Sequence, residues 1–114
     1  MASNQISVNL SPKDAAKLVC DYVIDGSATG TLIDNYTVYD CNDVLCLVLV
    51  FEKYYLRMGS RLTLTVVIDN LNGITNVRSI GGGGGDGFFT SFNWGTSSDF
   101  SNCAVDALRE YIIQ

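Results

Sequence analysis

The chain has 114 residues, a formal net charge of −5 and no histidine. Its length suits one domain with its own core, and 47% hydrophobic with 17% charged residues is typical of a globular protein rather than a disordered one. The seven basic residues against twelve acidic ones argue against binding to nucleic-acid backbones or anionic membranes, and the lack of histidine removes the commonest general base and metal ligand.

The first thirty residues predict a strand and then a helix. "QISVNL" alternates apolar and polar residues, which indicates a half-buried strand. In "SPKDAAKLVCDYVIDG", Ser11 can cap a helix, Pro12 fits its first position, and Gly26 can end it in a left-handed conformation. The apolar stripe expected on this helix consists of Ala15, Leu18, Val19 and Tyr22.

From Thr31 onward the apolar residues follow the two-residue period of strands. The segments "TLIDNYTVYD", "VLCLVLVFEKYYLR", "RLTLTVVID" and "ITNVRSI" are separated by the turn sequences "CND", "MGS" and "NLNG". The run 44–51 is apolar at every position, as expected of a central strand covered on both faces. One face would meet the helices, and the other a loop, a ligand or a second subunit. Glu52 is expected to pair across the sheet with Arg61 or Arg57.

The stretch "SIGGGGGDGFFTSFNWG", residues 79–95, raises the possibility of a phosphate-binding loop. Such a loop needs a helix start or a lysine behind it, but an alternating aromatic segment follows, and Asp86 places a negative charge where a phosphate would lie. We therefore expect a hairpin connection between Ile80 and Phe88, either a plain flexible loop or a lid over a pocket or partner surface. The lid would use Gly83, Gly85 and Asp86.

The last twenty residues, "GTSSDFSNCAVDALREYIIQ", predict a second amphipathic helix with Asp99 in its first turn. The fold class that follows is α+β: a strand, a helix, four or five antiparallel strands and a helix. We expect a single domain over residues 1–114, with a curved antiparallel sheet and both helices packed on one face.

No catalytic or metal-binding constellation is visible. The four cysteines have apolar neighbours and form no C-x-x-C pair, so we expect buried, reduced thiols. Nucleophilic triads need a histidine, and exposed carboxylate pairs in an acidic protein are mostly solvated surface. We therefore expect a protein that is not an enzyme and holds neither a metal nor a cofactor.

The N-terminus lacks the basic start and apolar core of a signal peptide. The longest apolar run has eight residues, which is too short to span a bilayer. These features predict a cytoplasmic protein that binds neither nucleic acid nor a membrane.

The order of elements resembles that of helix-grip and TATA-binding-protein-like folds, in which a strand and a helix precede an antiparallel sheet and a final helix. More locally, "GFFTSFNWG" followed by an acid-led terminal helix looks like a family of small uncharacterised bacterial proteins. The second resemblance implies no activity. The first implies an apolar ligand held between sheet and helix.

Two functions are therefore expected from different classes. The first is a binding module for an apolar small molecule or peptide, held between the sheet and the C-terminal helix. Its ligand-binding residues would be Tyr54, Phe88, Phe92 and Trp94. The alternative is a homo-oligomer, such as a homodimer, that associates through its sheet without a small-molecule ligand.

Overall fold

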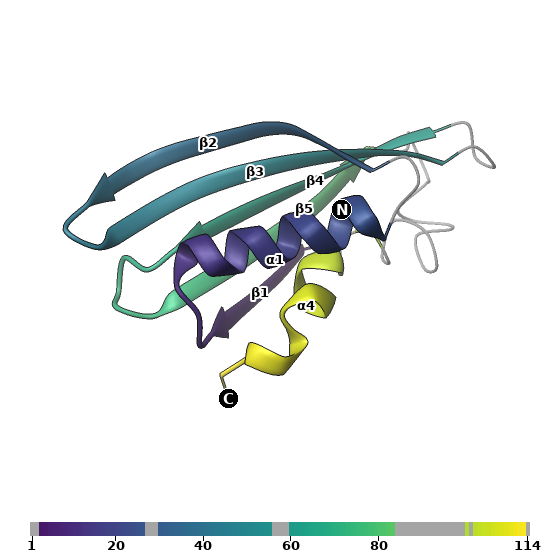
Figure 1. Ribbon diagram of the computed structural model, residues 1–114. Coiled ribbons are helices and arrows are strands. Elements are labelled where there is room, and N and C mark those ends of the chain that lie inside the picture. Colours follow the sequence, from purple (N-terminus) through teal and green to yellow (C-terminus); the bar gives the residue numbers. More distant parts are fainter. Residues whose placement is uncertain (1–2, 27–29, 56–59, 84–99, 101, 114) are drawn as a thin grey trace.

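The computed structural model describes residues 3–26, 30–55, 60–83, 100 and 102–113 (Figure 1). In chain order the elements are β1 (Ser3–Val8), α1 (Pro12–Asp25), β2 (Thr31–Cys41), β3 (Val44–Tyr55), β4 (Ser60–Asp69), β5 (Thr75–Gly83), the short helix α4 (Cys103–Ala107) and the 3-10 turn η1 (Arg109–Tyr111). The order strand, helix, four strands, helix is the one that the sequence predicts. The expected strand after residue 87 lies outside the described residues.

The five strands form one antiparallel sheet in the order β1-β5-β4-β3-β2. β2 to β5 follow one another as neighbours, whereas β1 pairs with β5 at the opposite edge from β2. The connection from β1 to β2 through α1 therefore crosses the whole sheet. In Figure 1, α1 lies over the sheet and α4 lies beside α1. β2 and β3 are visibly arched in the same view.

The core lies on one face of the sheet. Every second residue of β3 and β4 points into it, and these side chains are at most 7% exposed: Leu45, Leu47, Leu49, Phe51, Leu62, Leu64, Val66 and Ile68. Helix residues fill the same cluster, notably Ala15 and Val19 of α1 and Leu108 after α4. The alternation of "RLTLTVVID" predicts that Leu62, Leu64, Val66 and Ile68 point inward, and the structure confirms it.

α1 begins as the sequence predicts. The Ser11 hydroxyl accepts a hydrogen bond from the Asp14 backbone N–H at 3.2 Å, and Pro12 occupies the first turn. The left-handed end expected at Gly26 is wrong, because Gly26 has φ −85°. The buried side of α1 also differs from the predicted apolar stripe, because Val23 is buried and Tyr22 is 45% exposed.

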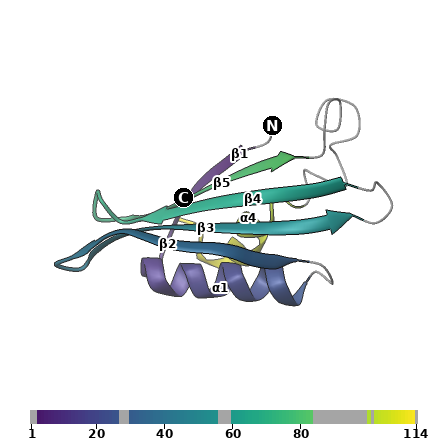
Figure 2. The ribbon, with the colours of Figure 1, turned by 90° about the horizontal axis from the view of Figure 1, so that it is seen from above.

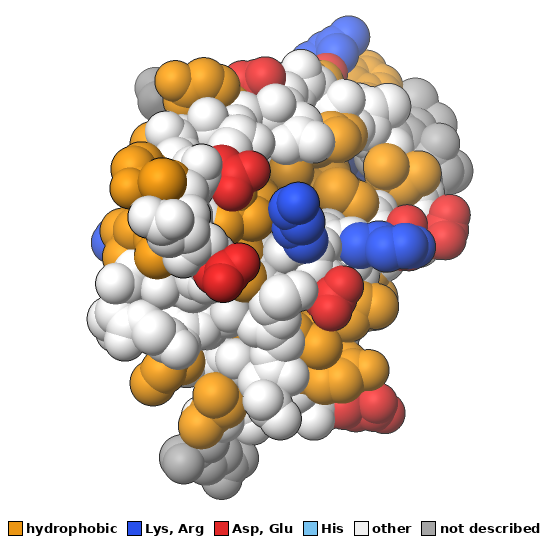
Figure 3. All heavy atoms as spheres, turned by 60° about the vertical axis from the view of Figure 1, so that its left-hand side comes forward, with side chains coloured by type: hydrophobic (Ala, Val, Ile, Leu, Met, Phe, Trp, Pro, Cys, Tyr) orange, Lys and Arg blue, Asp and Glu red, His pale blue; other side chains and the backbone are white. Residues whose placement is uncertain are grey.

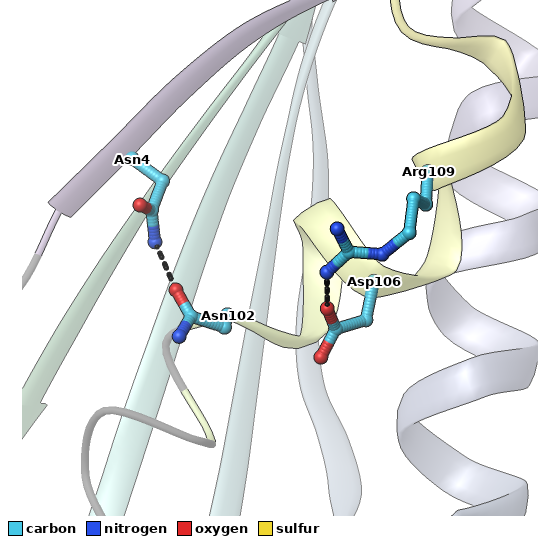
Figure 4. A network of polar contacts seen from close by, with 4 residues as sticks. All are labelled: Asn4, Asn102, Asp106 and Arg109. Atoms are coloured by element: carbon cyan, nitrogen blue, oxygen red, sulfur yellow. Dashed lines mark hydrogen bonds and ion pairs between the residues drawn. The ribbon is translucent and has the colours of Figure 1, made fainter. Parts of the chain in front are cut away.

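The helix of the C-terminal segment ends earlier than the sequence predicts. α4 ends at Ala107, and after η1 the chain returns to β1, where Ile112 makes an isolated bridge with Val8. The backbone N–H of Ile113 donates to the Ser7 carbonyl at 2.8 Å. At the other end of this segment, Asn4 Nδ2 donates to Asn102 Oδ1 at 2.9 Å (Figure 4). The tail is thus held to β1 at both ends, which an unbroken helix would not allow.

The glycine run begins inside the sheet rather than in a loop. Gly81, Gly82 and Gly83 pair with Leu64, Thr63 and Leu62 of β4. The expected loop start at Gly81 is therefore wrong. Strand pairing uses the backbone, so glycine continues the ladder even though it contributes no side chain to pack.

Candidate functional site

The face of the sheet turned away from α1 is the first candidate surface. Here we call it the outer face. Residues directly opposite one another in a ladder project to the same face, so the register assigns its members. Its apolar side chains come from four adjacent strands: Tyr36, Tyr39, Cys41, Val44, Cys46, Val48, Val50, Tyr54, Val67 and Ile80. Figure 2 views the sheet from this side, where no described helix crosses in front of the strands.

The outer face of β3 departs from the usual pattern of a solvated sheet. An antiparallel sheet with one face in water normally alternates apolar and polar residues. On β3 the outward positions 44, 46, 48 and 50 are Val, Cys, Val and Val, and all four are only half-buried. Tyr36 and Tyr39 extend this surface onto β2 and are 59% and 50% exposed. A contiguous apolar patch of this kind typically marks an interaction site.

Charged groups lie at the borders of the outer face. Glu52 Oε1 accepts a hydrogen bond from Arg61 Nη1 at 2.8 Å, which confirms the cross-strand pair expected for Glu52. Arg78 on β5 and Asp34 on β2 are exposed on opposite sides of the apolar centre. Asp69 lies on β4 directly opposite Cys46, so a carboxylate borders the central row of Val48 and Val67 at that end.

The second candidate surface is a groove between α1 and the strands β2 and β3, which we call the α1 groove. Its volume is about 300 Å³, at the lower end of the range for small-molecule sites. Leu45, Leu47 and Leu49 line it from β3. Polar groups surround them: Lys13 and Lys17 from α1, and Asn35, Thr37 and Asp40 from β2.

The α1 groove exists because the inward side of β2 is polar. Asn35, Thr37 and Asp40 pair with inward-facing leucines of β3, yet all three are exposed. α1 contacts both strands, and these polar side chains of the edge strand remain exposed beside it. Figure 3 shows the side of the molecule where α1 begins, with hydrophobic side chains lying between acidic and basic ones.

Two of the site residues expected from the sequence lie within the described chain. Tyr54 projects to the outer face at the end of β3, and the Arg61 guanidinium lies 5.6 Å from its ring centroid. Gly83 is the last residue of β5 and has φ +93°. The other expected residues, Gly85, Asp86, Phe88, Phe92 and Trp94, lie outside the described residues. The sequence did indicate the outer face through its run 44–51, but gave no signal for the α1 groove.

All four thiols are free. Burial raises the pKa of the Cys20 thiol, and the neighbouring Asp21 carboxylate raises it further. Burial also raises the pKa of Cys46, with Asp69 adding to the effect. Cys41 is exposed, so the expectation that every cysteine is buried is wrong for that residue. Neither raised pKa favours a nucleophilic thiolate.

Within the described ranges, no three metal-ligating side chains come together. In the same residues, no helix is both long enough and apolar enough to cross a membrane.

The model of one protein family matches residues 1–112, and that family is described only as one of unknown function. No curated protein and no solved structure matches the chain significantly. The resemblance to helix-grip and TATA-binding-protein-like folds therefore stays a prediction.

Proposed function

The chain belongs to this family of unknown function (DUF6054), and we propose that it is a non-enzymatic interaction protein that forms a homodimer through its outer face. The observation that carries the proposal is the outward row of β3, whose four positions 44, 46, 48 and 50 are all apolar on a face that no described helix covers. Burying these side chains against a second copy removes apolar surface from water.

The proposal requires the two helices to cover the same, inner face. Three observations support this arrangement. α1 and α4 contact each other. Ala104 and Leu108 belong to the same buried cluster as Ala15 and Val19 of α1. The Lys53 ammonium, on the inward side of β3, lies 5.9 Å from the ring centroid of Phe100.

The size of the outer face indicates how strong the association would be. Four strands about 4.8 Å apart, with about 27 Å of strand length, present roughly 500 Å². Stable complexes bury about 800 Å² per partner. We therefore expect a reversible dimer with a dissociation constant in the micromolar range, on the order of 1–100 µM.

The test is the molar mass in solution across this concentration range, measured by sedimentation equilibrium. The wild-type chain should shift from monomer to dimer, and Val48→Asp should remain a monomer because it places a charge at the centre of the interface. Ile24→Asp is the matched control, since Ile24 is an exposed aliphatic residue on α1. A wild-type chain that stays monomeric at about 200 µM would contradict the proposal.

A second candidate function is binding of a small amphipathic molecule in the α1 groove. The observation that favours it is the combination of a leucine floor with lysine and carboxylate groups at the border. It differs from the ligand expected from the sequence in two ways: the molecule is amphipathic rather than apolar, and it lies against α1 rather than the C-terminal helix. Between the sheet and that helix, Phe100, Ala104 and Leu108 are at most 2% exposed.

The second candidate is tested with an environment-sensitive anionic dye, 8-anilinonaphthalene-1-sulfonate. We expect its fluorescence to rise on binding the folded chain, and Ala16→Trp to abolish the rise by filling the groove. Ile24→Trp, on the exposed side of α1, should leave it unchanged. Equal fluorescence with both variants would rule out the α1 groove as the dye site.

A further inference from the structure

The charges at the borders of the outer face are distributed asymmetrically. Arg78 lies on β5 in the same cross-strand row as Val67, Val48 and Tyr36. Asp34 lies on β2, two residues along from Tyr36, in the row of Val50. Arg78 therefore lies on one side of the apolar centre and Asp34 on the other, and Asp69 lies on β4 in the row of Cys46. No ion pair of Arg78 or Asp34 is found among the described residues.

Two copies can stack these faces with a two-fold axis in one of two principal directions. An axis perpendicular to the strands places β5 over β5 and β2 over β2. That arrangement gathers both copies of Arg78 on one side of the interface and both copies of Asp34 on the other. Like charges brought together in this way are strongly unfavourable at an interface.

An axis parallel to the strands, between β3 and β4, has the opposite result. It places β5 of one copy over β2 of the other, while β3 and β4 cover each other in the centre. This rotation does not change the position of a residue along the strand direction, so each cross-strand row lies over the same row of the partner. Arg78 therefore faces the partner's Tyr36, and the partner's Asp34 is the next outward residue. Guanidinium groups bind favourably both to aromatic faces and to carboxylates.

We propose that the dimer has its two-fold axis parallel to β3 and β4, so that Arg78 of each copy contacts Tyr36 and Asp34 of the other. This inference rests on the proposed function, because it specifies the geometry of the same interface. A two-fold interface is isologous, so each charge contact occurs twice. Exposed ion pairs add little affinity, but reversing one partner creates two repulsive contacts.

The experiment uses two charge reversals, Arg78→Glu and Asp34→Arg, in the full chain. Each alone should weaken the dimer about tenfold or more, because each self-associates with two like-charge contacts. An equimolar mixture of the two variants should form a heterodimer of wild-type affinity, since both contacts then pair opposite charges. The double variant should also recover wild-type affinity.

Native mass spectrometry distinguishes these species by mass, and circular dichroism verifies that each variant folds.

Controls separate this contact from net charge. Arg109→Glu on η1 and Asp25→Arg on α1 make the same charge changes away from the outer face and should leave the dissociation constant unchanged. Asp34→Arg is informative because it lowers the net negative charge, which by itself would favour association.

The outcomes distinguish the two proposals. A monomeric wild-type chain contradicts the proposed function itself. A wild-type dimer that Val48→Asp dissociates, but that neither charge reversal weakens, overturns the arrangement alone. Weakening by both reversals without recovery in the mixture overturns it as well.

Discussion

The side chain of Asn70 ties the turn after β4 to the start of β3. Its Oδ1 accepts a hydrogen bond from the Leu45 backbone N–H at 2.8 Å, and its Nδ2 donates to the Asp43 carbonyl at 2.9 Å. Both bonds join segments more than twenty residues apart, so one amide side chain fixes two hairpin ends relative to each other.

Asn70→Ala should destabilise the fold by about 1–3 kcal/mol, because it leaves the partly buried N–H of Leu45 without a partner. Asn72→Ala is the matched control. Its Oδ1 accepts from Ile74 N and Asn76 Nδ2, both of which are exposed and can bond to water instead. Urea denaturation measures the difference. Equal losses for the two variants would mean that Asn70 does not hold the two hairpins together.

The glycines of β5 and its neighbouring turn should differ in their tolerance of alanine. Gly83 has φ +93°, and a Cβ there would lie 2.6 Å from the Arg61 carbonyl oxygen. Gly73 has φ +88° but open space around it. At Gly82 the φ is not positive, and a Cβ would meet only the Thr63 hydroxyl at 3.1 Å.

We expect Gly73→Ala to cost about 1–2 kcal/mol, the usual penalty of a left-handed residue. Gly83→Ala should cost more, since a backbone clash adds to the same penalty, and Gly82→Ala should cost least. Thermal unfolding of the three variants gives the ranking. A Gly83→Ala variant as stable as Gly82→Ala would show that Gly83 does not hold this conformation in solution.

Much of the sheet could be predicted because its signals are local. Alternation in "RLTLTVVID" assigns Leu62 and Leu64 to the core, and the "CND" turn is a two-residue hairpin whose Asn42 and Asp43 both have positive φ. The sequence also limited the partner of Glu52 to Arg61 or Arg57, and the structure shows the pair with Arg61. In each case, sequence neighbours are also neighbours in space.

The features that sequence missed depend on distant contacts. Tyr22 and Val23 lie on adjacent faces of α1, and only the position of α4 and the sheet decides which is buried. The terminal helix stops early because Ile112 pairs with Val8, more than a hundred residues earlier. The α1 groove likewise depends on how closely α1 covers β2, which no sequence period encodes.

The C-terminal segment should contribute directly to the core. Leu108 is fully buried, so Leu108→Ala should destabilise the fold by about 2–5 kcal/mol. Ile113→Ala, at a side chain that is 46% exposed, should cost less than about 1 kcal/mol. Urea denaturation midpoints test the pair. Equal effects would place Leu108 outside the cooperative core.

The thiols of Cys41 and Cys20 should differ in their rate of alkylation. Cys41 is exposed, whereas burial and the adjacent Asp21 raise the pKa of Cys20. At pH 8, iodoacetamide should therefore alkylate Cys41 faster than Cys20, as peptide mapping by mass spectrometry would show. Faster alkylation of Cys20 would contradict its partly buried position on α1.

The same shift affects stability in a defined direction. Because the fold raises the pKa of Cys20, the unfolded chain loses this proton first as the pH rises. The stabilisation from the protonated thiol is therefore complete below about pH 8.5 and is lost as the pH rises through the folded-state pKa. Cys20→Ala, which cannot titrate, should show a shallower decline of unfolding free energy above that pH than the wild-type chain.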